Sequence, residues 1–164
     1  MAALLYNQKL ADLTGQMATQ IFDELSVSRI ATELAILLTA RHWNRNYSFD
    51  THHRCAIKFG MKEKVVDAIE IGAHPKLDDE LEPVYEFATQ LLRDGDVSDE
   101  VFGRVADRWG RQGAVELIAT VGFSSMIALV LNVDRYPVPL EEEGRVLPVL
   151  GDGRAGACSI KGAP

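Results

Sequence analysis

The stretch Arg29–Gly60, RIATELAILLTARHWNRNYSFDTHHRCAIKFG, decides how this sequence folds. Its first half is apolar on almost every side of a helix, which is typical of a helix in the middle of a bundle or at a subunit interface. The polar break Asn44–Asn46 follows, and a second helix starts near Tyr47 or Ser48. Gly60 ends that helix, as glycine commonly does just past a helix C-terminus. The stretch therefore predicts a hairpin of two helices.

Outside this hairpin, the hydrophobic pattern predicts further helices and no strand. The expected helices cover residues 3–25, 61–71, 78–93, 98–109 and a last segment that begins at Gln112 or Gly113 and stops before Pro137. Ser26 or Ser28 caps the hairpin's first helix. We therefore expect an all-α domain of six or seven helices over residues 1–140, followed by a Gly/Pro-rich tail at 141–164.

Composition narrows the class of protein. The chain has 164 residues, of which 47% are hydrophobic, and a net charge of −7. The apolar content argues against disorder, and the scattered basic residues argue against nucleic acid, because phosphate binding needs clustered Lys and Arg. The first residues lack the order of a signal peptide. These features predict a soluble cytoplasmic protein with no nucleic-acid or membrane partner.

The long apolar run Ala114–Val133 raises the question of a membrane span. It contains several polar side chains, namely Glu116, Thr120, Ser124, Ser125 and Asn132. A membrane-spanning helix rarely carries that many polar groups, so we expect a buried core helix. Ser124 and Asn132 could line a pocket or could hydrogen-bond to another helix.

His52 lies at the centre of the apolar face of its helix. At 100° per residue, four apolar positions fall within about 60° of it, and these are Phe49, Cys55, Ala56 and Phe59. His53 sits at the edge of this stripe. A histidine in such a place is either a satisfied core residue or part of a site, and a neighbouring carboxylate favours the second.

Glu33 supplies a possible neighbour, because it lies in the first helix with apolar residues on nearly every side. A charge buried without a partner is costly. Two partners are available: Arg29, one turn earlier, and His52, if the two helices pack antiparallel. The first reading makes Glu33 a structural ion pair, and the second makes Glu33 and His52 a site.

Cysteine and metal chemistry find little support in the sequence. Cys55 and Cys158 show no metal-ligand spacing, and Cys158 lies in the Gly-rich tail, so we do not expect a disulfide. Cys55 alone is most simply a small hydrophobic residue. His42 could join His52 and His53, but no carboxylates or cysteines complete a recognised metal site. We expect no metal.

The hairpin residues resemble a known family. The pattern Tyr47-x-Phe49-x-x-His52-x-x-x-Ala56-x-x-x-Gly60 is similar to the YEWxxHxxxAxxxG motif of the carboxymuconolactone decarboxylase family. Glu33 matches the acidic position in the helix before the motif. The resemblance extends over roughly residues 13–139. It implies the helical bundle of the alkylhydroperoxidase D-like superfamily, assembled as a homo-oligomer, often a trimer or hexamer.

The resemblance also implies an activity, that of a lyase which decarboxylates a small carboxylate or lactone without a cofactor. His52 would be the general acid or base, and Glu33 would orient it. Substrate-binding positions would follow around the motif, at Trp43, Arg45, Tyr47, Ser48, Phe49 and His53. Arg45 would hold a substrate carboxylate at the mouth of the pocket.

Two departures from the family patterns open alternatives. Alkylhydroperoxidase D carries a CxxC that here reads Arg45 and Ser48, so thiol peroxidase chemistry through the remaining Cys55 is a minor hypothesis. The motif glutamate of the decarboxylases is Ser48 here, and a hydroxyl cannot replace a carboxylic acid in proton transfer. A helical oligomer that binds a small molecule or a protein and has lost catalysis is therefore the alternative to the lyase.

Overall fold

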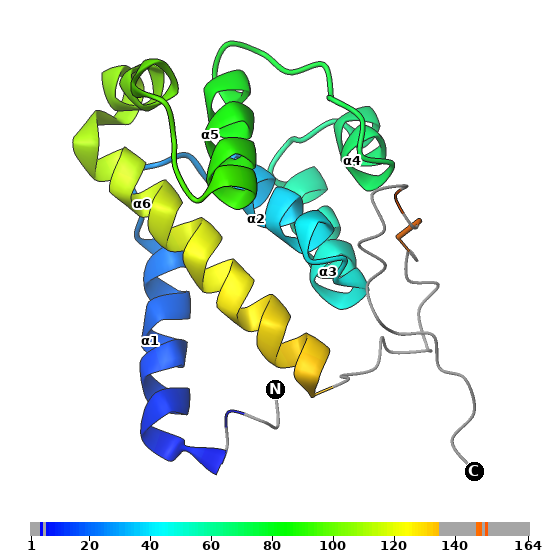
Figure 1. The fold of residues 1–164 in the computed structure, drawn as a ribbon, viewed down its shortest axis with the longest axis vertical. Helices are drawn as coiled ribbons and strands as arrows, with labels where there is room; N and C mark the ends of the chain where they lie inside the picture. Colours follow the sequence, from blue (N-terminus) through cyan, green and yellow to red (C-terminus); the bar gives the residue numbers. More distant parts are fainter. Residues whose placement is uncertain (1–3, 5, 135–146, 149, 151–164) are drawn as a thin grey trace.

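The chain folds into six helices in the computed structural model, which describes residues 4, 6–134, 147, 148 and 150 (Figure 1). No strand occurs among these residues, so the all-α prediction is confirmed. In chain order the helices are α1 (Gln8–Asp23), α2 (Arg29–His42), α3 (Asn46–Lys58), α4 (Glu63–Glu70), α5 (Leu81–Asp94) and α6 (Asp99–Val133). Most of the expected tail at 141–164 lies outside the described residues.

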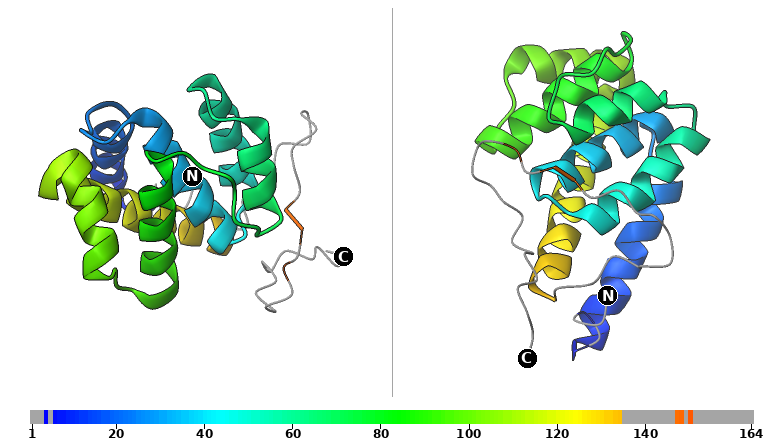
Figure 2. Two further views of the ribbon diagram at one scale, coloured as in Figure 1. Left: turned by 90° about the horizontal axis from the view of Figure 1, so that it is seen from above. Right: turned by 90° about the vertical axis from the view of Figure 1, so that its right-hand side faces the viewer.

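Helix α2 is the centre of the fold, as its all-round apolar character predicts. Every residue from Ala31 to Arg41 is buried. Helices α3, α5 and α6 pack around it (Figures 1 and 2), and α3 folds back along it to form the expected hairpin. The chain's own helices therefore cover α2 on all sides. The alternative expectation, a place for this helix at a subunit interface, is not needed to explain its composition.

Side-chain caps set where the central helices begin. The Ser28 hydroxyl caps α2, accepting the N–H of Ala31 while donating to Glu80 Oε1 at 2.6 Å. Helix α5 begins later than Asp78. Asp78 Oδ1 accepts from the backbone N–H groups of Glu80 and Leu81, and the helix proper begins at Leu81. Pro83 then falls in the first turn, where a missing N–H costs no helical hydrogen bond.

Helix α6 consists of two segments, as the sequence predicts. At Gly110 the backbone leaves helical geometry, with φ 70° and ψ 176°. The positive φ is easily reached only by glycine. By length and composition alone, α6 is long and apolar enough to cross a membrane, and 39% of its apolar 18-residue window is buried. The expectation of a buried core helix holds for one face only, because Val115 and Val133 remain well exposed.

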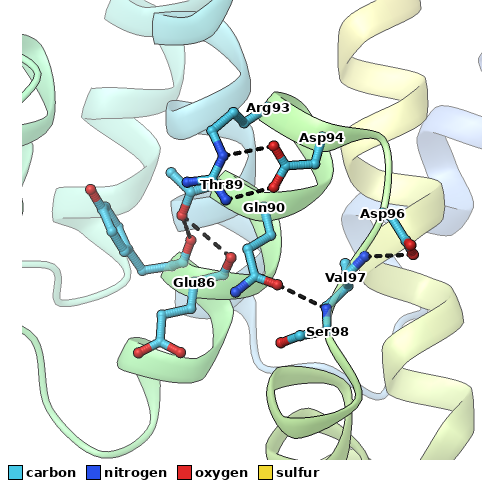
Figure 3. A network of polar contacts seen from close by, with 9 residues as sticks. Glu86, Thr89, Gln90, Arg93, Asp94, Asp96, Val97 and Ser98 are labelled. Carbon is cyan, nitrogen blue, oxygen red and sulfur yellow. Dashed lines mark hydrogen bonds and ion pairs between the residues drawn. The ribbon is translucent and has the colours of Figure 1, made fainter.

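The turn between α5 and α6 is fixed by polar contacts to its backbone (Figure 3). Gly95 ends α5 in a left-handed conformation. The Gln90 side chain accepts the N–H of Ser98 at 2.9 Å, and Asp96 accepts the N–H of Val97 at 2.8 Å. Ser98 then caps α6 by accepting from Val101. These bonds use backbone donors at the turn and orient α6 against α5.

The Glu116 carboxylate fastens the connection between α1 and α2 to α6. Its Oε2 accepts from the Ser26 hydroxyl at 2.7 Å and from the backbone N–H groups of Ser26 and Val27 at 2.8 and 3.1 Å. Partial burial raises the pKa of this carboxyl. Hydrogen bonds from Gln112, Ser26 and Val27 outweigh that effect, and the pKa lies below its ordinary value.

We expect Glu116→Gln to lower the free energy of unfolding by about 1–2 kcal/mol at neutral pH, because an amide oxygen accepts these bonds more weakly than a carboxylate. The lowered pKa makes the loss pH-dependent. The stabilisation is complete above the unfolded-state pKa of about 4.3 and disappears as pH falls through the lower folded-state value. Urea unfolding from pH 7 downward measures it, with Asp107→Asn as the exposed control. If the difference in unfolding free energy between wild type and Glu116→Gln did not change with pH, the role of the Glu116 carboxylate would be contradicted.

Candidate functional site

Glu33 and His52 form a pair between the two helices of the hairpin. Glu33 is fully buried in α2, and its Oε2 lies 2.7 Å from His52 Nδ1 on α3. Its other oxygen, Oε1, lies 2.9 Å from Arg29 Nη2, an ion-pair contact one turn earlier in α2. The two partners that the sequence offered as alternatives are therefore both used, one by each oxygen.

Arg29 is held in place by two aromatic rings. Its guanidinium lies 5.3 Å from the Phe22 ring centre and 5.1 Å from that of Phe59, and it also donates to the Phe22 carbonyl. Aromatic faces attract a cation, so the side chain is fixed beside Glu33. A fixed positive charge next to the buried carboxylate offsets the cost of burying it.

The contact with Glu33 assigns the two nitrogens of His52. A carboxylate oxygen only accepts hydrogen bonds, so Nδ1 carries the hydrogen that points to Glu33. In the neutral ring, Nε2 is then the acceptor. Phe22 lies against the ring at 5.7 Å between centres. The result is an oriented imidazole whose second nitrogen is free of the Glu33 contact.

A small cavity lies beside this ring, between α1, α2, α3 and α6. Its volume is about 100 Å³. The walls are mostly apolar, and the polar side chains among them are Ser48, His52 and Ser124. The apolar lining comes from Ala18, Phe22, Ile36, Ala40, Phe123 and Ile127. One imidazole and two hydroxyls in an apolar cavity can move a proton and can hydrogen-bond a small polar ligand.

The other positions that the resemblance marks for substrate do not line this cavity. Phe49 is fully buried in the core, and Arg45 is 7% exposed. Trp43 donates its indole N–H to Ser125 Oγ at 2.9 Å, and Asn132 donates to the Trp43 carbonyl. Tyr47 is half-buried on the first turn of α3. Of the predicted substrate positions, the structure brings only Ser48 to the cavity with His52.

His53 and Cys55 have other surroundings. His53 Nε2 lies 2.9 Å from Glu63 Oε1, linking α3 to α4. Burial, and then the nearby Glu33, raise the pKa of the Cys55 thiol. A raised pKa keeps the thiol protonated at neutral pH, whereas thiol peroxidase chemistry needs a thiolate. Cys158 lies outside the described residues.

Much of the cavity lining could not be found by motif reasoning. Phe22 on α1 and Phe123 on α6 line the cavity with His52, although they come from distant parts of the chain. Their only signal in the sequence is an ordinary apolar position. Ser124 carried a weak signal as a polar residue within an apolar helix, and it does line the cavity.

The two aromatic positions near His52 should respond differently to truncation. We expect Phe49→Ala to cost about 3–5 kcal/mol of unfolding free energy, because it empties a fully buried core site. Phe22→Ala should cost less, since Phe22 is only half-buried beside the cavity. Chemical denaturation of both variants measures this. Equal losses would contradict the separation of core and cavity.

Among the described residues, no group of three His, Cys, Asp or Glu side chains is placed to hold a metal ion.

The chain was also compared with known proteins. Comparison with family models, curated proteins and solved structures gives no match.

Proposed function

We propose that this protein is a lyase of the carboxymuconolactone decarboxylase type that acts without a cofactor on a small carboxylate or lactone. The observation that carries the proposal is the buried Glu33 carboxylate on Nδ1 of His52, whose ring lines a small apolar cavity. A carboxylate that orients an imidazole is a recurring arrangement in general acid–base sites. The second support is the sequence motif around His52, which resembles that of the carboxymuconolactone decarboxylase family.

In the proposed reaction the C–CO2 bond breaks and protonated His52 gives the proton on Nε2 to the carbon that loses CO2, after which Nε2 takes up a proton from solvent. Glu33 fixes the ring and stabilises its imidazolium form. Ser48 occupies the position of the motif glutamate and cannot act as an acid, so His52 is the proton donor in this proposal. The hydroxyls of Ser48 and Ser124, which border the cavity, would hydrogen-bond a substrate oxygen.

The cavity also limits the substrate class. About 100 Å³ bounded mainly by apolar side chains suits a small molecule with few polar groups. Arg45 is buried and does not line this space, so carboxylate binding by Arg45 forms no part of the proposal. A second cavity of about 210 Å³, bordered by Arg41 and Arg93, contains neither Glu33 nor His52.

The test is a panel of small β-keto acids and lactones incubated with the wild-type protein while CO2 is measured. Release of CO2 from one class of compound above the rate without protein supports the lyase. Binding without product, detected by calorimetry, would replace it with the small-molecule-binding alternative. Loss of peroxide with a thiol donor, abolished by Cys55→Ser, would instead favour the peroxidase hypothesis.

We further propose that the protein works in the cytoplasm as a homo-oligomer, a trimer or hexamer if it follows the family. The acidic net charge of −7 supports a soluble protein. Exposed apolar side chains on α1 and α6 support self-association, since α2 is covered within one copy.

A further inference from the structure

The outer face of α6 carries an apolar stripe that none of the described residues covers. Val115, Ile118, Leu129 and Val133 are 62%, 44%, 43% and 85% exposed, and Gly122 is exposed between them. At 100° per residue these positions fall within about 60° of one another. No charged residue occurs from Leu117 to Val133. Uninterrupted apolar faces of this kind mark interaction sites on soluble proteins.

From Val115 to Leu129 the stripe is symmetric about Gly122, whereas Val133 would lie opposite Arg111. Ile118 and Met126 lie four residues before and after it, and Val115 and Leu129 lie seven residues before and after it. A two-fold axis through Gly122 would cross two antiparallel copies of α6. It would place Ile118 of each copy against Met126 of the other, and Val115 against Leu129. Such a self-complementary pattern is what an isologous interface requires.

Gly122 also allows the two helices to approach closely. A Cβ built at this position meets no described atom within 4 Å. Glycine inside a helix costs about 1 kcal/mol relative to alanine. The described residues give no packing reason for that cost, and close contact with a second backbone supplies one.

We propose that a second copy of this chain docks on the outer face of α6, antiparallel and with its two-fold axis at Gly122. A lipid bilayer is the less suitable occupant, because the opposite face of α6 packs on α2 and α5, which carry buried and surface charges. The stripe from Val115 to Val133 is about 27 Å long. The area that a single helix pair of this length buries is small compared with the roughly 800 Å² per partner of stable interfaces. Association should therefore depend on protein concentration.

This contact between two copies does not depend on the proposed reaction, but it restricts which oligomers the protein can form. Pairs built on this axis yield dimers, or hexamers made of three such pairs, and do not yield a simple trimer. Light scattering after size exclusion, over a concentration series up to the millimolar range, should show an even number of copies. A wild-type protein that stays monomeric or forms only trimers would overturn the proposal, as would a monomer that floats with phosphatidylcholine–phosphatidylglycerol vesicles.

Charge substitution tests the register of the pair. Ile118→Lys or Met126→Glu alone should shift the mass to that of the dissociated form, while the double variant should restore the pair because each Lys then faces a Glu of the other copy. Ile71→Lys is the control, because it also replaces an apolar side chain by a charged one, at a 63% exposed site outside the stripe. Circular dichroism checks that each variant is folded. A double variant that stays dissociated would contradict the antiparallel register.

Cross-linking gives a second measurement that leaves Gly122 unchanged. In a Cys55→Ser, Cys158→Ser background, Ile118→Cys together with Met126→Cys places a cysteine of each copy opposite one of the other, so mild oxidation should link two chains. Gly103→Cys, on α6 outside the stripe and with open space around it, should remain uncross-linked. Equal cross-linking of the two variants, or of neither, would overturn the assignment of the axis.

Discussion

Replacing His52 by glutamine is expected to lower turnover by about 10²–10⁴-fold, the usual contribution of a positioned general acid or base. Glutamine can still hydrogen-bond Glu33, but its amide cannot accept and return a proton at neutral pH. The fold should survive, because the His52 side chain is 17% exposed beside a cavity rather than locked in the core. The rate is measured as CO2 release from the compound that the wild-type panel identifies.

A second histidine substitution controls for general effects. His74 lies in the loop between α4 and α5 and does not border the cavity, so His74→Gln should leave turnover within about two-fold of wild type, in keeping with the small effects of most surface substitutions. Wild-type turnover in His52→Gln would remove His52 from the mechanism. Loss of turnover together with loss of helicity would show a structural role instead.

Replacing Glu33 by alanine is expected to cost about 3–5 kcal/mol of unfolding free energy, the usual penalty for leaving a buried ion pair with one partner missing. Both donors that face Glu33 would lose their acceptor: the Arg29 guanidinium, 25% exposed, and Nδ1 of His52. The emptied volume adds a cavity to this loss. Urea unfolding at neutral pH measures the difference.

Glu33→Gln separates the charge from the volume. The amide fills the same space and its oxygen can still accept from His52, so the expected loss is smaller than for alanine. The remaining loss reports the missing charge beside Arg29. A cost below about 1 kcal/mol for Glu33→Ala, the size typical of an exposed pair, would contradict the buried network.

The hairpin was predictable from the sequence because local rules agree there. An apolar helix, a short polar break and a helix with one apolar stripe leave few ways to pack, and the short connection brings Glu33 and His52 to adjacent helices. The choice between Arg29 and His52 as the partner of Glu33 could not be made from spacing. A carboxylate has two oxygens, and only the three-dimensional arrangement shows that each takes a different partner.

Other parts of the site depend on long-range packing that periodicity does not encode. Phe49 and Phe22 are both aromatic residues near His52, yet the first is in the core and the second borders the cavity. Which face of α6 is buried also follows from how α2 and α5 lie against it. The apolar run Ala114–Val133 predicts burial, whereas the described residues leave one of its faces exposed.

The most direct test of the central claim, that Glu33 orients His52 for proton transfer, is the tautomer of the His52 ring. Long-range nitrogen–proton NMR correlations identify it in the neutral ring. We expect hydrogen on Nδ1 and a bare Nε2 in the wild-type protein. A ring protonated on Nε2, or a mixture of tautomers unchanged by Glu33→Ala, would contradict it.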